Sequence, residues 1–202
     1  MNELRGRVLK STGKWYQVLL PDGNIVECRV RGRLKLEGLK TTNPIAVGDV
    51  VILDPKSDEE GKRVIVDYEL RENYIVRKST NLSKQMHILA ANIDRAYLMV
   101  TLKYPETHFV FIDRFLVAAE SFRIPTTLIF NKVDLLDDEG LLDLKAILFM
   151  YESVGYPCHA ISATNEQDIG FLREEIKDKQ VMIAGHSGTG KSGFMKNPRP
   201  TC

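Results

Sequence analysis

Residues 181–192, VMIAGHSGTGKS, give the strongest indication of the fold. The first four residues are apolar and β-prone, which predicts a buried strand. The next eight, Gly185–Ser192, fit the pattern G-x-x-x-x-G-K-[ST] of a phosphate-binding loop, in which glycines let successive N–H groups converge on an anion. A flexible glycine loop without a ligand is the alternative. The strand directly before the loop favours phosphate binding.

Each part of this loop has an expected role. Lys191 would neutralise charge on the β- and γ-phosphates, and the Ser192 hydroxyl would ligate Mg²⁺. His186 would contribute only its backbone N–H. The predicted phosphate-binding set is Gly185, His186, Ser187, Gly188, Thr189, Gly190, Lys191, Ser192 and Gly193.

Strands and helices alternate upstream of this loop. Strands are expected at 96–100, 127–130 and 159–161, and helices at 108–123, 141–154 and 168–176. Such alternation builds a parallel sheet covered by helices on both faces.

The sequence Asn131-Lys132-Val133-Asp134 follows the strand expected at 127–130, where open α/β sheets bind ligands. The Asp134 carboxylate can accept the N1–H and N2–H₂ donors of guanine, which adenine lacks. The Asn131 amide can meet guanine N7 and O6, and the Lys132 stem can lie over the base. Alone this is a weak string, but beside a phosphate loop it favours guanine.

Ser162 and Ala163 end the next expected strand. The N–H of Ala163 could donate to guanine O6 and so reject adenine. A small turn that begins a helix is the alternative, and only the position after the N-K-x-D strand gives the pair weight.

The first 70 residues predict a different architecture. Short β-rich runs at 6–8, 16–20, 25–28, 50–53 and 63–66 are separated by turn residues. Five strands in so short a segment suggest a small closed barrel, of OB or SH3-like type. Residues 1–70 are therefore expected as a barrel, 71–92 as a linker and 93–202 as the α/β domain.

Cations alternate at Arg29, Arg31, Arg33 and Lys35. On a strand they would share one face, either as a solvated surface or as a row of contacts to nucleic-acid phosphates. Trp15 and Tyr16 could stack on RNA bases, although packing in the barrel is the favoured interpretation.

The composition describes an ordinary globular protein. The chain of 202 residues is 44% hydrophobic and 27% charged, with net charge +1. No apolar run is long enough to span a bilayer, and no secretory signal begins the chain. The three cysteines and four histidines are dispersed, which argues against disulfides and a zinc site. A cytoplasmic monomer is expected.

The order of the motifs is informative, because the base-reading elements precede the phosphate loop, whereas most small GTPases have the reverse order. A circularly permuted GTPase behind a β-barrel resembles the ribosome-small-subunit-dependent GTPase A family (RsgA, also called YjeQ or YloQ). Further matches are VGDVV at 47–51, ANID at 91–94 and IDRFLVAAE at 112–120. The resemblance covers roughly residues 3–193.

The resemblance implies a fold, ligands and partners. The fold would be an N-terminal all-β barrel of the OB type, followed by an α/β P-loop GTPase domain that is circularly permuted and incomplete. The barrel would help to dock on ribosomal RNA, and the GTPase would act in late maturation of the small ribosomal subunit. GTP or GDP with Mg²⁺ would bind, and the family also carries zinc in a C-terminal domain.

The sequence departs from the family after Lys191. The switch I threonine, the D-x-x-G of switch II and the zinc ligands are absent, and Pro198 and Pro200 cannot continue a helix. The strings DEEG at 58–61 and DDEG at 137–140 precede the loop and read as acidic turns. We expect a truncated or frameshifted family member that hydrolyses GTP very slowly, with strand 181–184 left as an exposed edge.

Two other functions are compatible with the residues. One is an RNA-binding barrel with a nucleotide-binding appendage that never hydrolyses its ligand. The other is an ATP-using P-loop kinase, which the guanine-reading string NKVD disfavours.

Overall fold

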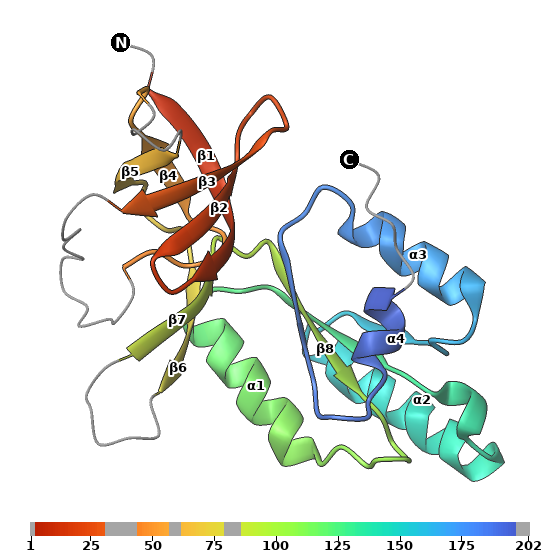
Figure 1. The fold of residues 1–202 in the computed structure, drawn as a ribbon. Coiled ribbons are helices and arrows are strands. Elements are labelled where there is room, and N and C mark those ends of the chain that lie inside the picture. Colours follow the sequence, from red (N-terminus) through yellow and green to blue (C-terminus); the bar gives the residue numbers. More distant parts are fainter. Residues whose placement is uncertain (1–2, 31–43, 57–61, 79–85, 197–202) are drawn as a thin grey trace. The chain divides into compact units, whose positions relative to one another are not determined.

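The computed structural model describes residues 3–30, 44–56, 62–78 and 86–196. The chain divides into two compact units, Met1–Ile93 and Asp94–Thr201, which are described separately (Figure 1).

The first unit contains a closed five-stranded barrel with neighbour order β1-β2-β3-β5-β4, closed by pairing of β1 with β4. Its strands are β1 (Leu4–Thr12), β2 (Trp15–Leu19), β3 (Ile25–Val30), β4 (Val50–Leu53) and β5 (Arg63–Tyr68). All pairs are antiparallel except β3 with β5. Alternate side chains, among them Val8, Val18 and Ile65, fill the interior. The closed barrel expected from the spacing of the β-rich runs is confirmed, and so is the OB type that the family resemblance implies.

A buried ion pair lies at the base of this barrel. The Asp49 carboxylate is fully buried and accepts bonds from Arg71, Nε to Oδ1 at 2.7 Å and Nη2 to Oδ2 at 2.6 Å. Oδ2 also accepts the N–H of Ala46 at 2.8 Å, and Arg71 Nη2 donates to the carbonyl of Pro44 at 2.8 Å. Both charges are thus paired and hydrogen-bonded, the condition under which burial of charge is tolerated.

The segment 71–92, expected as a linker, contains two paired strands and is attached to the barrel at both ends. Strands β6 (Tyr74–Lys78) and β7 (Met86–Ala91) pair with each other. Arg71 begins the segment in its buried ion pair, and the side chain of Asn92 at the other end donates to the carbonyl of Gly48 at 3.1 Å. These contacts place the segment in the first unit, because they fix both of its ends to the turn before β4.

The second unit is a four-stranded parallel sheet with neighbour order β10-β9-β8-β11. Its strands are β8 (Arg95–Val100), β9 (Thr126–Phe130), β10 (Cys158–Ala160) and β11 (Val181–Ala184). Its helices are α1 (Phe109–Ser121), η1 (Val133–Leu135), α2 (Asp138–Ser153), α3 (Glu166–Ile176) and α4 (Lys191–Lys196). The expected strand–helix alternation is confirmed, with ends that differ from the expectation by up to three residues.

Helices cover both faces of this sheet. Leu98 and Val100 of β8 point to α1 and α2, where Ile112, Leu116 and Leu144 complete one apolar core. The intervening residues Tyr97 and Met99 point to α3, against Ile169 and Leu172. Alternation along buried parallel strands therefore assigns side chains to two separate cores.

Strand β11 is one of the two edge strands in the described part of the sheet, where it pairs with β8 alone. Its four residues are half-buried, whereas those of the central strand β9 are fully buried. Within the described residues, no helix is both long and apolar enough to cross a membrane.

We predict that Asp49→Asn lowers the free energy of unfolding of the barrel by about 3–5 kcal/mol, because it leaves Arg71 buried without a counter-charge. Trp15 is the sole tryptophan of the chain and lies in β2, so its fluorescence during urea unfolding reports on the barrel.

Glu69→Gln is the matched control, because Glu69 pairs with Arg5 on the exposed surface of the same unit at 3.0 Å. It should cost no more than about 1 kcal/mol. Equal effects of the two substitutions would contradict the importance of the buried pair.

Candidate functional site

Three segments that are distant in sequence meet at the carboxyl ends of the parallel strands. They are the residues after β9, the residues after β10 and the loop after β11. The Asn131 side chain, only 4% exposed, joins them. Its Nδ2 donates to the carbonyl of Thr189 at 2.8 Å, and its Oδ1 accepts the N–H of Ala163 at 2.8 Å. The NKVD string, the Ser-Ala pair and the glycine-rich loop thus lie together at one end of the sheet.

Two glycines let the loop approach so closely. A Cβ on Gly190 would lie 2.1 Å from Asn131 Nδ2, and one on Gly185 would lie 2.2 Å from the carbonyl oxygen of Met99. Both residues also have φ values, +102° and +141°, that side chains disfavour. The first and last glycines of the motif are therefore required for the loop to pack against β8 and Asn131.

Lys191 folds back over the phosphate loop. Its Nζ donates to the carbonyl of Gly185 at 2.7 Å and to that of His186. Thr189 is fully buried, and its hydroxyl also donates to the His186 carbonyl, at 2.9 Å. Ser192 is exposed at the start of α4. The loop therefore holds a closed shape while its lysine and serine remain at the surface.

Lys132 and Asp134 take different positions after β9. Lys132 has a left-handed backbone, φ +65°, and its Nζ donates to the carbonyl of Tyr104. Asp134 lies in η1 with an exposed carboxylate. The hydrogen bond from Lys132 to the loop after β8 was not predicted from the sequence.

The Ser-Ala pair is held by α3. The N–H of Ser162 donates to Asp168 Oδ2 at 2.8 Å. Asn165 caps α3, and Asp168 lies three residues later, the spacing at which a side chain reaches back past the cap. The N–H of Ala163, expected to donate to guanine O6, donates to Asn131 instead.

The segment between β8 and α1 supports the phosphate loop and was missed by the sequence reasoning. Pro105 lies 3.3 Å from a Cβ placed on Gly188, and the ring of Phe111 lies 3.8 Å from that of His186. The side chain of His186, expected to be passive, thus packs on α1. Nothing in the sequence indicated that Pro105 and Phe111 would pack against the glycine-rich loop, because the spacing of residues along the chain does not show which distant side chains pack together.

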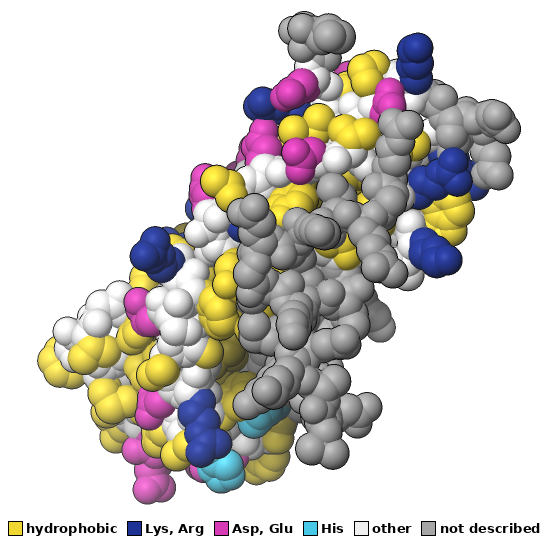
Figure 2. Space-filling model, turned by 90° about the vertical axis from the view of Figure 1, so that its left-hand side faces the viewer, with side chains coloured by type: hydrophobic (Ala, Val, Ile, Leu, Met, Phe, Trp, Pro, Cys, Tyr) yellow, Lys and Arg dark blue, Asp and Glu magenta, His cyan; other side chains and the backbone are white. Residues whose placement is uncertain are grey.

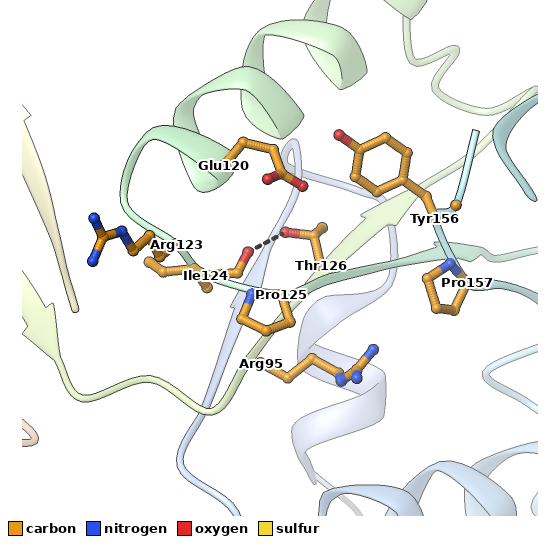
Figure 3. A pocket seen from close by; sticks show the side chains of 9 residues that line it. Arg95, Glu120, Arg123, Ile124, Pro125, Thr126, Tyr156 and Pro157 are labelled. Carbon is orange, nitrogen blue, oxygen red and sulfur yellow. Dashed lines mark hydrogen bonds between the residues drawn. The ribbon is translucent and has the colours of Figure 1, made fainter. Parts of the chain in front are cut away.

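A pocket at the opposite end of the sheet is separate from this site (Figure 3). It has a volume of 460 Å³ and lies at the starts of β8 and β9, where Arg95, Glu120 and Tyr156 contribute to its walls. Ligands of open α/β sheets bind at the carboxyl ends of the strands, so this pocket is not the nucleotide site. Arg95 donates to the hydroxyl of Thr127 at 2.8 Å, which gives it a structural role.

Two family models match the chain. The RsgA GTPase model matches residues 68–201, and the RsgA N-terminal domain model matches residues 5–62. The chain belongs to the RsgA GTPase family. Small ribosomal subunit biogenesis GTPase RsgA from Bacteroides fragilis is 48% identical over 189 residues, which are 94% of this chain and 60% of that protein. The same-named protein from Christiangramia forsetii is 48% identical over 98% of this chain and 63% of its own length.

Solved structures of the RsgA family agree with the fold. YjeQ from Thermotoga maritima matches with a TM-score of 0.80 and 33% identity, over all of this chain and 66% of that one. YloQ, described as a circularly permuted GTPase, matches with a TM-score of 0.74 and 25% identity over 99% of this chain and 66% of that one. The permuted order predicted from the motifs is confirmed, and the chain spans about three-fifths of the curated relatives' length.

The remaining predicted site residues are the alternating cations. Arg31, Arg33 and Lys35 lie outside the described residues, whereas Arg29 is exposed on β3, directly across from Trp15 of β2. Trp15 is 39% exposed with the Lys62 ammonium 4.1 Å from its ring centre, and Tyr16 packs in the barrel core. The described residues contain no group of three or more His, Cys, Asp or Glu that could hold a metal ion.

We predict that Gly190→Ala breaks the bond from Asn131 to Thr189 and lowers the free energy of unfolding of the second unit by about 2 kcal/mol or more. Urea unfolding followed by helical circular dichroism measures the change. Gly170→Ala in α3 is the control, because its Cβ meets nothing within 4 Å. It should be neutral or stabilise by up to about 1 kcal/mol; a neutral Gly190→Ala would contradict the close approach.

Proposed function

We propose that the second unit binds guanine nucleotides, with the base at NKVD and the phosphates on the 185–193 loop. The observation that carries this proposal is the Asn131 side chain of the NKVD string, which bonds Thr189 of the loop and Ala163 of the turn after β10. One nucleotide can then reach both segments, with its base at NKVD and its phosphates on the loop. The GTPase family supports guanine as the base.

The base-reading residues retain the hydrogen-bonding capacity that guanine needs. A side-chain amide has two N–H donors, and the Thr189 carbonyl takes only one of those on Asn131. The second, now 3.9 Å from Met99 Sδ, would be the donor for guanine N7 or O6, which are both acceptors. The exposed carboxylate of Asp134 would accept from guanine N1–H and N2–H₂. Lys132 would lie over the base, and the Ser162–Ala163 turn would line its O6 edge.

The phosphate loop fits the nucleotide's charged end. The Lys191 ammonium already donates hydrogen bonds to carbonyls of the loop. Phosphate oxygens would replace these acceptors without a large change in the position of the ammonium. Mg²⁺ commonly uses few protein ligands and completes its shell with phosphates and water. The exposed Ser192 hydroxyl fits that limited role and would be its ligand from this chain.

We infer slow GTP hydrolysis by these 202 residues. Phosphoryl transfer needs a group that positions the attacking water and a contact that senses the γ-phosphate, besides the phosphate loop. The only strings in the sequence that resemble switch II, DEEG at 58–61 and DDEG at 137–140, precede the loop. The latter begins α2, where Asp137 caps the helix through the N–H of Gly140.

We further propose that the chain acts on the small ribosomal subunit, as a monomer in the cytoplasm, with the barrel contacting ribosomal RNA. The names of its relatives motivate this partner. Trp15, Arg29 and Lys62 form an exposed aromatic and cationic surface on β2, β3 and the start of β5. Stacking of bases on aromatic rings together with phosphate neutralisation is typical of RNA-binding barrels.

Calorimetric titration with GDP and ADP, each with Mg²⁺, tests the nucleotide proposal. Binding of GDP but not ADP is expected. Asp134→Ala should weaken GDP about 10–100-fold, because it removes two hydrogen bonds to a charged acceptor. Asp138→Ala, which removes another exposed carboxylate from the same region, should change the affinity less than about twofold.

Equal binding of ADP would contradict guanine selectivity and favour the kinase alternative. Absence of binding of either nucleotide would contradict the proposed site and leave the barrel as the functional part.

The RNA proposal predicts that Trp15→Ala and Arg29→Ala weaken co-sedimentation with small ribosomal subunits. Arg29→Ala should also reduce the dependence of binding on salt, because one fewer counterion is released. Leu70→Ala is the control, since its side chain is exposed elsewhere in the same unit. Unchanged binding by both variants would exclude this surface as the contact.

A further inference from the structure

A groove between α1 and α2 forms a second recess in the second unit. It has a volume of 560 Å³ and is lined by Phe109 and Asp113 of α1 and by Ile147, Met150 and Tyr151 of α2, with Val154 at the end. The nucleotide motifs contribute none of its walls.

The α2 side of this groove is an apolar stripe. Ile147, Met150 and Val154 follow one another at three- and four-residue spacing, so their side chains share one face of the helix. Met150 is 46% exposed and Val154 67%. Phe109 contributes a further large side chain, 46% exposed, from α1. Single exposed apolar residues are ordinary, as on the face drawn in Figure 2, but a lined recess is not.

The electrostatics of the groove are acidic. Asp113 is the one charged residue in its lining, and its Oδ1 accepts the Tyr151 hydroxyl at 3.0 Å. Burial of Tyr151 and the Asp113 carboxylate raise the pKa of this phenol, which keeps it neutral as the donor. The other charges of α2 are mostly negative: Asp138, Glu139, Asp143 and Glu152 against Lys145.

A mostly apolar groove with one carboxylate in its lining fits one class of occupant. A helix with apolar side chains on one face can place them against Phe109 and Met150, which is how helices are recognised in grooves. A flanking lysine or arginine would reach Asp113, whose second oxygen is free to accept. We propose that this groove binds a basic amphipathic helix of a partner protein. This site is independent of the nucleotide and RNA sites proposed above.

The probe is a fluorescein-labelled Leu/Lys peptide of about five helical turns with all leucines on one face. Fluorescence anisotropy measures its binding to the full chain. A peptide of the same composition with scrambled order and a Leu/Glu peptide with the same pattern are the comparisons. The ordered Leu/Lys peptide should bind at least about tenfold more tightly than either.

Met150→Lys should weaken this binding at least about tenfold, because it places a cation inside the groove. Phe149→Lys is the matched control: it adds the same charge to the same helix, but Phe149 is 74% exposed and does not line the groove. It should change binding less than about twofold. Asp113→Asn should weaken the Leu/Lys peptide while leaving a Leu/Gln analogue unchanged.

Equal loss of binding with Met150→Lys and Phe149→Lys would overturn the proposal, because general charge attraction would then explain the binding. Equal binding of the scrambled peptide would overturn it as well. Self-association that Met150→Lys abolishes would instead identify a second copy of this chain as the occupant. Helical circular dichroism confirms that each variant folds. GDP titration of the same samples tests the nucleotide site separately from the groove.

Discussion

The Asn131 side chain is the interaction on which the second unit's site depends. It is buried at the carboxyl end of β9, and its two polar atoms bond the phosphate loop after β11 and the turn after β10. A buried amide left without these partners would cost about 1–3 kcal/mol. The same bonds that stabilise the carboxyl end of the sheet therefore hold the base-binding and phosphate-binding segments at a fixed separation.

The close approach of the loop explains why particular residue types occur around Asn131. Gly190 leaves the space that the amide occupies, and Gly185 leaves the space for the carbonyl of Met99. The circularly permuted order does not disturb this arrangement, because parallel strands bring their carboxyl ends together whatever their order in the chain. In the barrel, the buried ion pair of Asp49 with Arg71 likewise joins two segments that are distant in sequence.

Much of this structure could be predicted from the sequence, because its signals are local. Short β-rich or apolar runs marked the strands, and the glycine-rich motif after β11 marked the phosphate loop. The pairing of β6 with β7 was missed, since the Arg71–Asp49 pair that fixes this segment joins residues 22 positions apart. Likewise, Asn131 was predicted to read the base, but its bond to Thr189 spans 58 positions and depends on the sheet order. Long-range contacts of polar side chains leave no pattern that spacing can reveal.

Binding of inorganic pyrophosphate with Mg²⁺ to the Asn131→Ala variant tests this account most directly. Pyrophosphate contacts no base-reading residue, so its affinity reports on the shape of the phosphate loop alone. If Asn131 holds that loop through Thr189, Asn131→Ala should weaken pyrophosphate about tenfold or more, along with GDP. Unchanged pyrophosphate affinity with weakened GDP would show that Asn131 only reads the base, and would contradict the account.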